Sequence, residues 1–128
     1  AFLGAGRMRD AERTLKAIRS AAADNGDNAY MARKIGLPLA EGFMAFEAGR
    51  YEECVEKILG VRGLAQRFGG SHAQRDILTL TALHAALRGN LHGAADALSA
   101  ERLTHKPHSP WAGRLAQRAR TLGAAQLA

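Results

Sequence analysis

The sequence predicts an all-α protein made of antiparallel helical hairpins that stack into an α-α superhelix, and three observations support this. Hydrophobic residues make up 47% of the 128-residue chain but aromatic residues only 5%, with many alanines and leucines, a composition that favours closely packed helices. No segment alternates polar and apolar residues as a half-buried strand does. One glycine-centred motif also occurs three times, at intervals suited to repeated hairpins.

The repeated motif contains a glycine, a large apolar residue two positions later, a small residue five positions later and an aliphatic residue nine positions later. Its glycines are Gly6, Gly49 and Gly89, at intervals of 43 and 40 residues. Because glycine lacks a Cβ, it permits the left-handed turn on which many helices end. We therefore expect a helix to end on each of these glycines and the following helix to fold back on it.

The first half of the chain is predicted to contain two long helices. After a helix tail at residues 1–5, one helix covers residues 8–23 and stops in the loop at residues 24–28, where aspartate, asparagine and glycine favour turns and caps. The next helix covers residues 28–48. Pro38 predicts a kink in this helix or a break just before the proline, because proline removes a backbone donor and crowds the preceding turn.

The second half is predicted to contain four further helices, of which three cover residues 51–67, 71–88 and 91–104. The last begins with Ser109 as its cap and Pro110 at its first helical position, a strong start signal, and Gly123 ends it. Residues 1–128 thus form one domain, with hairpins at about 1–23, 28–67 and 71–104 and a terminal helix at about 109–122. Because the chain begins inside a helix tail, we expect it to be the C-terminal fragment of a longer protein.

Charge and cysteine content narrow the classes of partner. The chain has 18 lysines and arginines against 12 aspartates and glutamates, a net charge of +6, which suggests nucleic acid. The basic residues are interleaved with acidic ones and lack alternating aromatic platforms, however, so clusters such as Arg114 and Arg118 are predicted to be solvated helix faces. With one cysteine, no apolar segment of roughly 20 residues and no signal-peptide pattern, we expect a cytoplasmic protein without membrane contact.

The segment from Ser71 to Asp76 raises the question of catalysis, because it contains the residue types of a serine hydrolase triad. Adjacent residues on a helix point about 100° apart, so the side chains of Ser71 and His72 diverge. Ser71 and Gln74 fit instead the capping box that starts a helix. No catalytic residue is therefore predicted.

Metal and cofactor sites are not predicted either. The five histidines include no pair four residues apart on one helix, and no cysteine and histidine ligand set occurs. No glycine-rich loop has the preceding strand and the lysine that a phosphate site requires. His84 and Cys54 are expected to be packing residues, and Trp111 is expected to anchor the last helix rather than act as a binding hot spot.

Three stretches carry a resemblance to known families. The glycine motif at Gly6, Gly49 and Gly89 resembles the tetratricopeptide repeat class, whose usual repeat of about 34 residues is shorter than the intervals found here. A narrower match begins at the corner Ala48-Gly-Arg-Tyr51. Together with Phe68-Gly-Gly-Ser-His-Ala-Gln-Arg-Asp76 and Leu103-Thr-His-Lys-Pro-His-Ser-Pro110, it makes residues 40–120 look like the C-terminal region of the tetratricopeptide repeat protein 38 family. The resemblance implies a helical solenoid and a longer full-length chain.

In tetratricopeptide-like arrays the first helix of each hairpin lines the concave side. We expect that side to form a groove for a protein or peptide partner, with an apolar floor beside a polar rim. The residues expected in the groove are Leu39, Phe43, Phe46, His72, Arg75, Asp76 and Thr79. Phe43 and Phe46 can alternatively be core residues. The prediction is thus a noncatalytic helical-repeat module that mediates protein–protein interactions.

Two other functions stay open. The chain can be an accessory domain of an enzyme whose active site lies in a missing N-terminal region, or a weak nucleic-acid binder through its basic helices. A homodimer through exposed repeat surfaces is a further expectation, because the first half-hairpin can pair with a second copy.

Overall fold

Helices account for the regular structure of the described chain. The computed structural model describes residues 8–67 and 72–127, which contain helices and no strand. In chain order the elements are α1 (Met8–Ala23), α2 (Asp27–Met31), the π-helical segment η1 (Ala32–Gly36), α3 (Leu37–Glu47), α4 (Tyr51–Arg67), α5 (His72–Arg88), α6 (His92–His105) and α7 (Pro110–Leu127). None of these helices is long and apolar enough to cross a membrane. The all-α prediction is confirmed, and the predicted helix tail at residues 1–5 lies outside the described residues.

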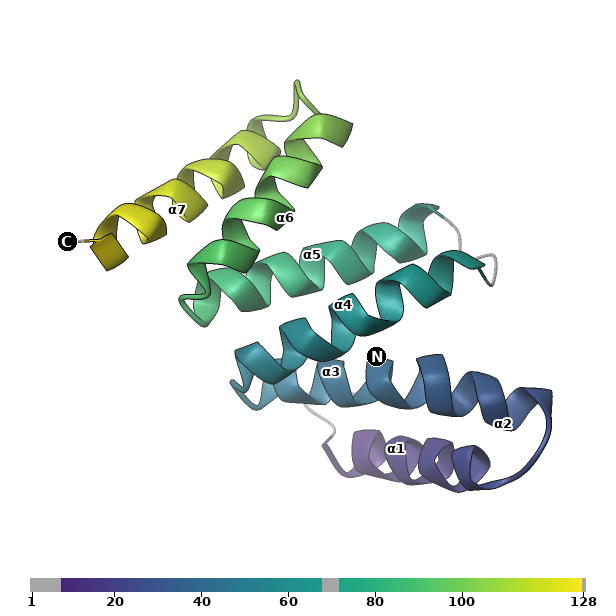
Figure 1. Ribbon diagram of the computed structural model, residues 1–128. Coiled ribbons are helices and arrows are strands. Elements are labelled where there is room, and N and C mark those ends of the chain that lie inside the picture. Colours follow the sequence, from purple (N-terminus) through teal and green to yellow (C-terminus); the bar gives the residue numbers. More distant parts are fainter. Residues whose placement is uncertain (1–7, 68–71, 128) are drawn as a thin grey trace.

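The helices pack side by side in chain order (Figure 1). α4 packs against α3 and α5, and α6 packs against α5 and α7. α1 lies along the segment from α2 to α3, so that α1 and α7 form the two ends of the array (Figure 1). α3 with α4 and α5 with α6 each form a helical hairpin, as the glycine motif predicts.

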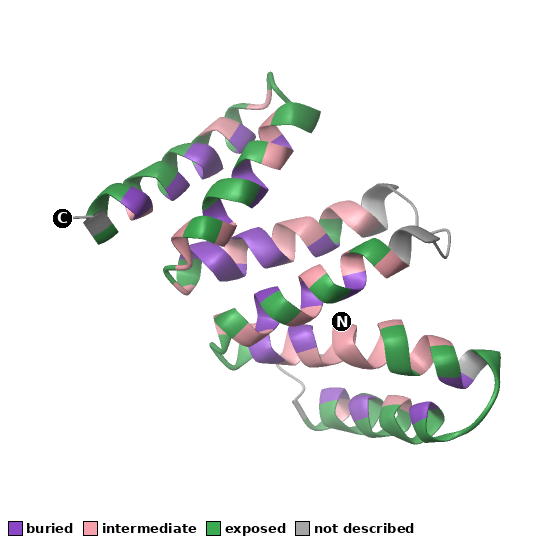
Figure 2. Ribbon diagram, viewed as in Figure 1, coloured by how far each residue is buried: buried purple, intermediate pink, exposed green. Residues whose placement is uncertain are grey.

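The core lies between the central helices (Figure 2) and consists largely of small side chains. The described hydrophobic residues without exposed surface are Ala45, Cys54, Ile58, Ala82, Leu83, Ala85, Ala86, Ala95 and Ala119. Because an alanine side chain is a single methyl group, helices that meet through alanines can approach closely and still exclude water. The alanine-rich composition therefore accounts for the close packing of α3 to α7.

Of the kink or break predicted at Pro38, the break does not occur. Met31, Gly36 and Leu37 keep right-handed helical φ and ψ angles, so that α2, η1 and α3 form one continuous helical segment. Proline has no N–H, and its ring crowds the carbonyl four residues back. In the wider π turn that precedes it, the Leu37 N–H donates to the Ala32 carbonyl five residues back. This wider turn is the physical reason that the helix tolerates the proline.

The two corners of the glycine motif that the structure describes, at Gly49 and Gly89, use different residues for the left-handed turn. Gly49 has a φ of +79°, as the glycine motif predicts. At the corner between α5 and α6 the left-handed residue is Asn90, with a φ of +56°, and not Gly89. Asparagine adopts this conformation more readily than most residues that carry a Cβ. The predicted turn on Gly89 is thus wrong by one residue, and Gly6 lies outside the described residues.

Backbone hydrogen bonds show that Asn90 is the counterpart of Gly49. At each corner the next N–H donates to the carbonyl five residues back, from Arg50 to Ala45 and from Leu91 to Ala86, both at 2.8 Å. This closure is common where a helix ends in a left-handed residue. Equivalent residues of α4 and α6 are therefore 41 positions apart in the sequence, as Gly49 and Asn90 are, and not 40 positions apart as in the glycine motif.

Gly89 and Gly123 serve close packing. A Cβ at Gly89 would lie 2.8 Å from the Cβ of Tyr51, so the first residue of α4 packs directly on the end of α5. A Cβ at Gly123 would lie 2.3 Å from Cε1 of His92, the first residue of α6. α7 continues through Gly123 to Leu127. The prediction that Gly123 ends the last helix is therefore wrong, because its missing Cβ makes room for His92 instead of permitting a turn.

The start of α7 agrees with the prediction. Pro110 is its first residue, and the Ala112 N–H donates to Ser109 Oγ at 3.2 Å, as expected of a capping serine. Ser71 of the other predicted cap lies outside the described residues.

Candidate interaction surface on α5 and α7

The apolar half of the predicted groove packs against the core. Leu39, Phe43 and Phe46 of α3 are half-buried and contact the core residues. The ring of Phe46 meets that of Tyr51 edge-on, with 5.7 Å between centroids. The guanidinium carbon of Arg88 lies 5.0 Å from the centroid of Phe46. These α3 residues thus contribute to packing, and Phe46 links α3 to the end of α5.

The polar half of the predicted groove lies on α5. Arg75, Asp76 and Thr79 are half-buried, and the His72 side chain lies outside the described side chains. The Asp76 carboxylate accepts a hydrogen bond from Nη1 of Arg102 on α6 at 2.7 Å. Asp76 therefore contributes to the contact between α5 and α6.

Arg102 is the buried centre of this contact. Only 7% of its surface is exposed, and it occupies on α6 the position that Val61 occupies on α4, 41 residues earlier. Its guanidinium carbon lies 4.9 Å from the ring centroid of Trp111, while its Nε has no hydrogen-bond partner in the described structure. Burial of an arginine is costly unless its charge is paired. The ion pair with Asp76 supplies that partner.

Trp111 combines packing with exposure. It is the second residue of α7, and its ring centroid lies 6.1 Å from that of His84 on α5. With Arg102 over its ring, the tryptophan joins three helices, in agreement with the predicted anchor. Even so, 37% of its surface is exposed. The alternative role as a binding residue thus stays open to it.

An exposed stripe runs along α5 beside this cluster. Ile77, His84 and Arg88 follow at intervals of seven and four residues and share one side of the helix. Ile77 is 56% exposed, more than the other exposed large apolar side chains of the described chain. Arg88 is also exposed and His84 is half-buried. The open side of α5 therefore carries both apolar and basic groups.

A matching stripe runs along α7. Trp111, Arg114 and Arg118 follow at intervals of three and four residues and are exposed on one side of the helix. The contact between Trp111 and His84 places this stripe beside that of α5. We call the combined surface the basic face, formed by Ile77, His84, Arg88, Trp111, Arg114 and Arg118.

Positive charge dominates the basic face. α5 and α7 together contain five arginines and a single carboxylate, that of Asp76, which pairs with Arg102. Burial lowers the pKa of His84, and the positive charges of Arg118, Arg88 and Arg102 lower it further. The positive charges of these three arginines therefore all oppose protonation of the His84 imidazole ring.

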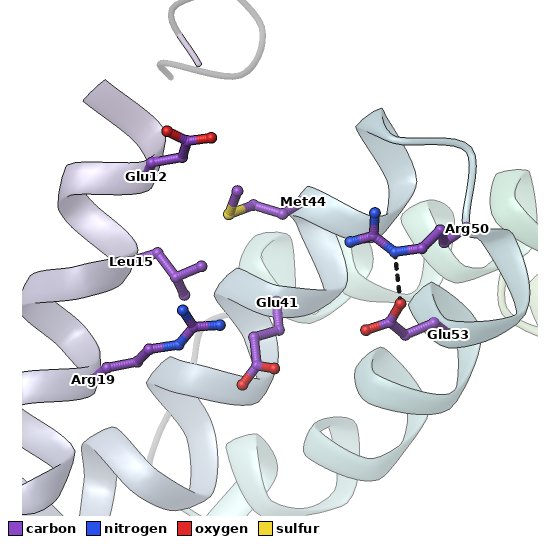
Figure 3. Close-up of a pocket in the computed structure, with 7 residues that line it drawn as sticks. All are labelled: Glu12, Leu15, Arg19, Glu41, Met44, Arg50 and Glu53. Carbon is purple, nitrogen blue, oxygen red and sulfur yellow. Dashed lines mark hydrogen bonds and ion pairs between the residues drawn. The ribbon is translucent and has the colours of Figure 1, made fainter. Parts of the chain in front are cut away.

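A separate cleft lies between α1 and α3, at the other end of the array (Figure 3). It has a volume of about 370 Å³ and is lined by Glu12, Leu15, Arg19, Glu41, Met44, Arg50 and Glu53. Arg50 pairs with Glu53 at 2.8 Å, and Lys57 pairs with Glu41 at 3.6 Å. The charges of this cleft are thus largely balanced, and the basic face is the stronger candidate for binding a charged partner.

The described residues contain neither a cluster of metal ligands nor a cysteine thiol that ionises near neutral pH. No group of three or more histidine, cysteine, aspartate or glutamate side chains among them is arranged to hold a metal ion. Cys54 is buried. Burial, and then the charge of Glu53, raise the pKa of its thiol to about 11, so the thiol stays protonated near neutral pH. What the basic face offers a ligand is charge and apolar contact.

No family model matches the chain, and no solved structure matches it. The resemblance to the tetratricopeptide repeat families therefore stays a prediction, based on the three glycine corners and the loop segments.

Sequence reasoning missed Ile77, Arg88 and Arg102 as site residues. A single arginine in a helical segment normally indicates a solvated side chain, and nothing local to Arg102 contradicts this. Its position becomes informative only when α6 is aligned with α4 at the offset of 41, which places the arginine where Val61 is buried. The missed signal is therefore a mismatch between two repeats.

Proposed function

We propose that this protein is a noncatalytic helical-repeat module, with its hairpins in a tetratricopeptide-like superhelix, that binds a partner protein through the basic face. The observation that carries the proposal is the exposure of Ile77 and Trp111, at 56% and 37%, on α5 and α7, two helices that meet where Trp111 lies beside His84. Large apolar side chains that stay exposed near one another and are surrounded by polar groups are typical of protein-interaction sites.

The basic face is held in place from beneath. Arg102 bonds Asp76 of α5 and lies over Trp111 of α7, so that α5, α6 and α7 are joined through one side chain. A surface that is fixed before binding loses less conformational entropy when a partner binds. Because Asp76 and Arg102 neutralise each other, their pairing supports a role in binding rather than in acid–base catalysis.

The basic face adjoins the groove predicted from the sequence. Phe46, from the predicted apolar floor, contacts Arg88 at the edge of the basic face. The proposed binding site therefore extends from the α3 residues toward α5 and α7, with its centre near His84 and Trp111.

The proposal is tested with a pair of exposed apolar residues. Ile77→Ser removes apolar surface from the basic face, and Tyr30→Ser removes it from α2, where Tyr30 is 44% exposed at the other end of the array. We expect a partner captured by the wild type to be retained by Tyr30→Ser and lost by Ile77→Ser, with both variants melting as the wild type does. Full retention of the partner by Ile77→Ser would contradict the proposal.

A further inference from the structure

We infer that the partner presents a short acidic segment with a bulky apolar side chain, its carboxylates pairing with Arg88, Arg114 and Arg118 while the apolar side chain contacts Ile77 and Trp111. The inference rests on the proposed interaction role and adds the chemical class of the partner.

The arginines of α7 are available to such a segment. Arg114 and Arg118 are exposed and make no hydrogen bond or ion pair with another described residue. Arg88 is exposed as well, and its contact with the face of the Phe46 ring leaves the guanidinium able to donate in its own plane. Arginine binds carboxylates through two parallel N–H groups, which gives the pairing a defined geometry.

Two of the three carboxylates on α5 and α6 are engaged in ion pairs, and the third, that of Asp96 on α6, is exposed. Asp76 pairs with Arg102 at 2.7 Å, and Glu101 of α6 pairs with Arg62 of α4 at 2.9 Å. α7 contains no acidic residue, and α5 contains none besides Asp76. The charge of the basic face thus has no counterpart on α5 or α7, and such a field attracts and orients a negatively charged partner.

The pKa of His84 responds to the positive charge of the basic face. Its ring lies beside Trp111, and after burial the charges of Arg118 and Arg88 are the largest causes of its lowered pKa. An acidic segment bound to these two arginines would offset their charges. Binding should therefore raise the pKa of His84, which supplies a readout that is independent of affinity.

An acidic protein segment fits the basic face better than a nucleic acid does. Single-stranded nucleic acid needs successive aromatic platforms on which its bases stack. The basic face has one exposed aromatic residue, Trp111, and its other exposed apolar group is the aliphatic side chain of Ile77. The spacing of Arg114 and Arg118 on one side of α7 matches carboxylates about one helical turn apart.

The test begins with an unbiased peptide-display selection against the full chain, followed by fluorescence anisotropy with the selected peptides, with versions in which glutamine and asparagine replace the acids, and with a single-stranded RNA. We expect the selected peptides to be rich in aspartate and glutamate around a large apolar residue. Their affinity should fall with rising salt and with the loss of their carboxylates. Titration of His84 by NMR should show a higher pKa in the bound state than in the free protein.

A matched pair of variants locates the binding. Arg114→Gln combined with Arg118→Gln removes two charges from the basic face, and Arg9→Gln combined with Arg13→Gln removes two exposed charges from α1. Each exposed charge pair contributes modestly to affinity, so the first double variant should lower the affinity for the acidic peptides by about fivefold or more. The second should leave their binding unchanged apart from a small common effect of net charge.

The outcomes separate the inference from the function on which it rests. The acidic partner is overturned if the selected peptides carry no acidic enrichment, or if they bind both double variants equally. The interaction role stays in place in these cases when Ile77→Ser loses the peptides. Peptides that Ile77→Ser still binds fully overturn the interaction role itself. RNA that binds the wild type while no acidic peptide does would replace the inference with nucleic-acid binding.

Discussion

The hairpins α3–α4 and α5–α6 share a backbone plan but differ in what they bury. Each corner closes on one left-handed residue, Gly49 or Asn90, with the same hydrogen bond after it. Counted from these two residues, Cys54, Ile58 and Val61 of α4 correspond to Ala95, Ser99 and Arg102 of α6. All six are buried. The second hairpin therefore carries a serine and an arginine where the first carries isoleucine and valine.

This difference indicates two tasks within one fold. In the first hairpin the equivalent positions serve packing alone, because apolar side chains fill them. In the second hairpin, Arg102 takes the place of a buried apolar side chain and contacts Asp76 and Trp111. A buried polar group lowers stability unless it is paired, and Arg102 pairs with Asp76. Because it also lies over Trp111, we infer that Arg102 positions the basic face.

The largest effect on stability is expected at Ile58, the counterpart of Ser99. Ile58 has no exposed surface, and its Cδ1 would lie 2.9 Å from a Cβ at Gly42, so α3 packs directly upon it. Ile58→Ala should lower the free energy of unfolding by about 3 kcal/mol, through lost burial and the cavity it leaves.

The counterpart Ser99→Ala is the control. Ser99 Oγ donates to the Asp96 carbonyl within its own helix at 3.0 Å, and alanine retains most of its volume, so a change below about 1 kcal/mol is expected. Urea denaturation measures both variants. Equal losses would show that the two hairpins do not differ as their side chains indicate.

Arg102 should show an intermediate effect that depends on what replaces it. Arg102→Ala leaves Asp76 without its partner and uncovers Trp111, and should lower the free energy of unfolding by about 2 kcal/mol, since Asp76 is 39% exposed and can be partly hydrated. Asp76→Ala with Arg102→Leu removes both charges and should return stability to within about 1 kcal/mol of the wild type.

The same double variant separates stability from function. If Arg102 positions Trp111 for a partner, the variant should lose binding and change its tryptophan fluorescence although it is stable. Undiminished binding would mean that the ion pair has only a structural role.

A smaller effect is expected where each hairpin packs on the end of a neighbouring helix. Tyr51 packs on Gly89, and the equivalent His92 packs on Gly123. Gly123→Ala should cost about 1.5 kcal/mol, because a Cβ would overlap the His92 ring. Gly113→Ala, on the same helix with open space around it, should stabilise the protein by about 0.5 kcal/mol. Thermal melting of both variants tests this contrast.

The sequence predicts the helices well and the register of the second corner less well. Capping and turn residues such as Ser109 and Pro110 act locally, so their signal is readable without the fold. Gly89 and Asn90 can both end a helix. Gly89 lies where Tyr51 packs and leaves no room for a Cβ, and this contact between distant residues cannot be read from the local sequence. Gly123 shows the same ambiguity.

The candidate site is less predictable than the helices, because it depends on contacts between distant residues. Asp76 and Arg102 are 26 residues apart, and neither position identifies the other from the sequence. The exposed stripe of α5 includes Ile77, the neighbour of the predicted Asp76, and adjacent residues on a helix point in different directions. The sequence therefore suggests a partner-binding role, which stays a proposal, but it does not identify the open side of α5.

The smallest expected effect is a pH dependence that arises at His84 of the second hairpin. Burial, with Arg118, Arg88 and Arg102, lowers the pKa of His84 below its ordinary value of 6.5. The unfolded chain therefore binds a proton at a higher pH than the folded chain does. As the pH falls through about 6.5 toward the lower pKa of the folded state, the unfolded state gains protons first and the free energy of unfolding decreases.

Urea denaturation at about pH 7.5 and about pH 5.5 should show this decrease in the wild type and a smaller one in His84→Gln. Arg118→Gln should raise the pKa of His84 and also reduce the decrease, because it removes one of the charges that oppose protonation. A variant in the first hairpin, Lys57→Gln, should leave the decrease unchanged. If all four proteins depend on pH equally, the arginines of the basic face do not act on His84, and the field inferred for a partner is absent.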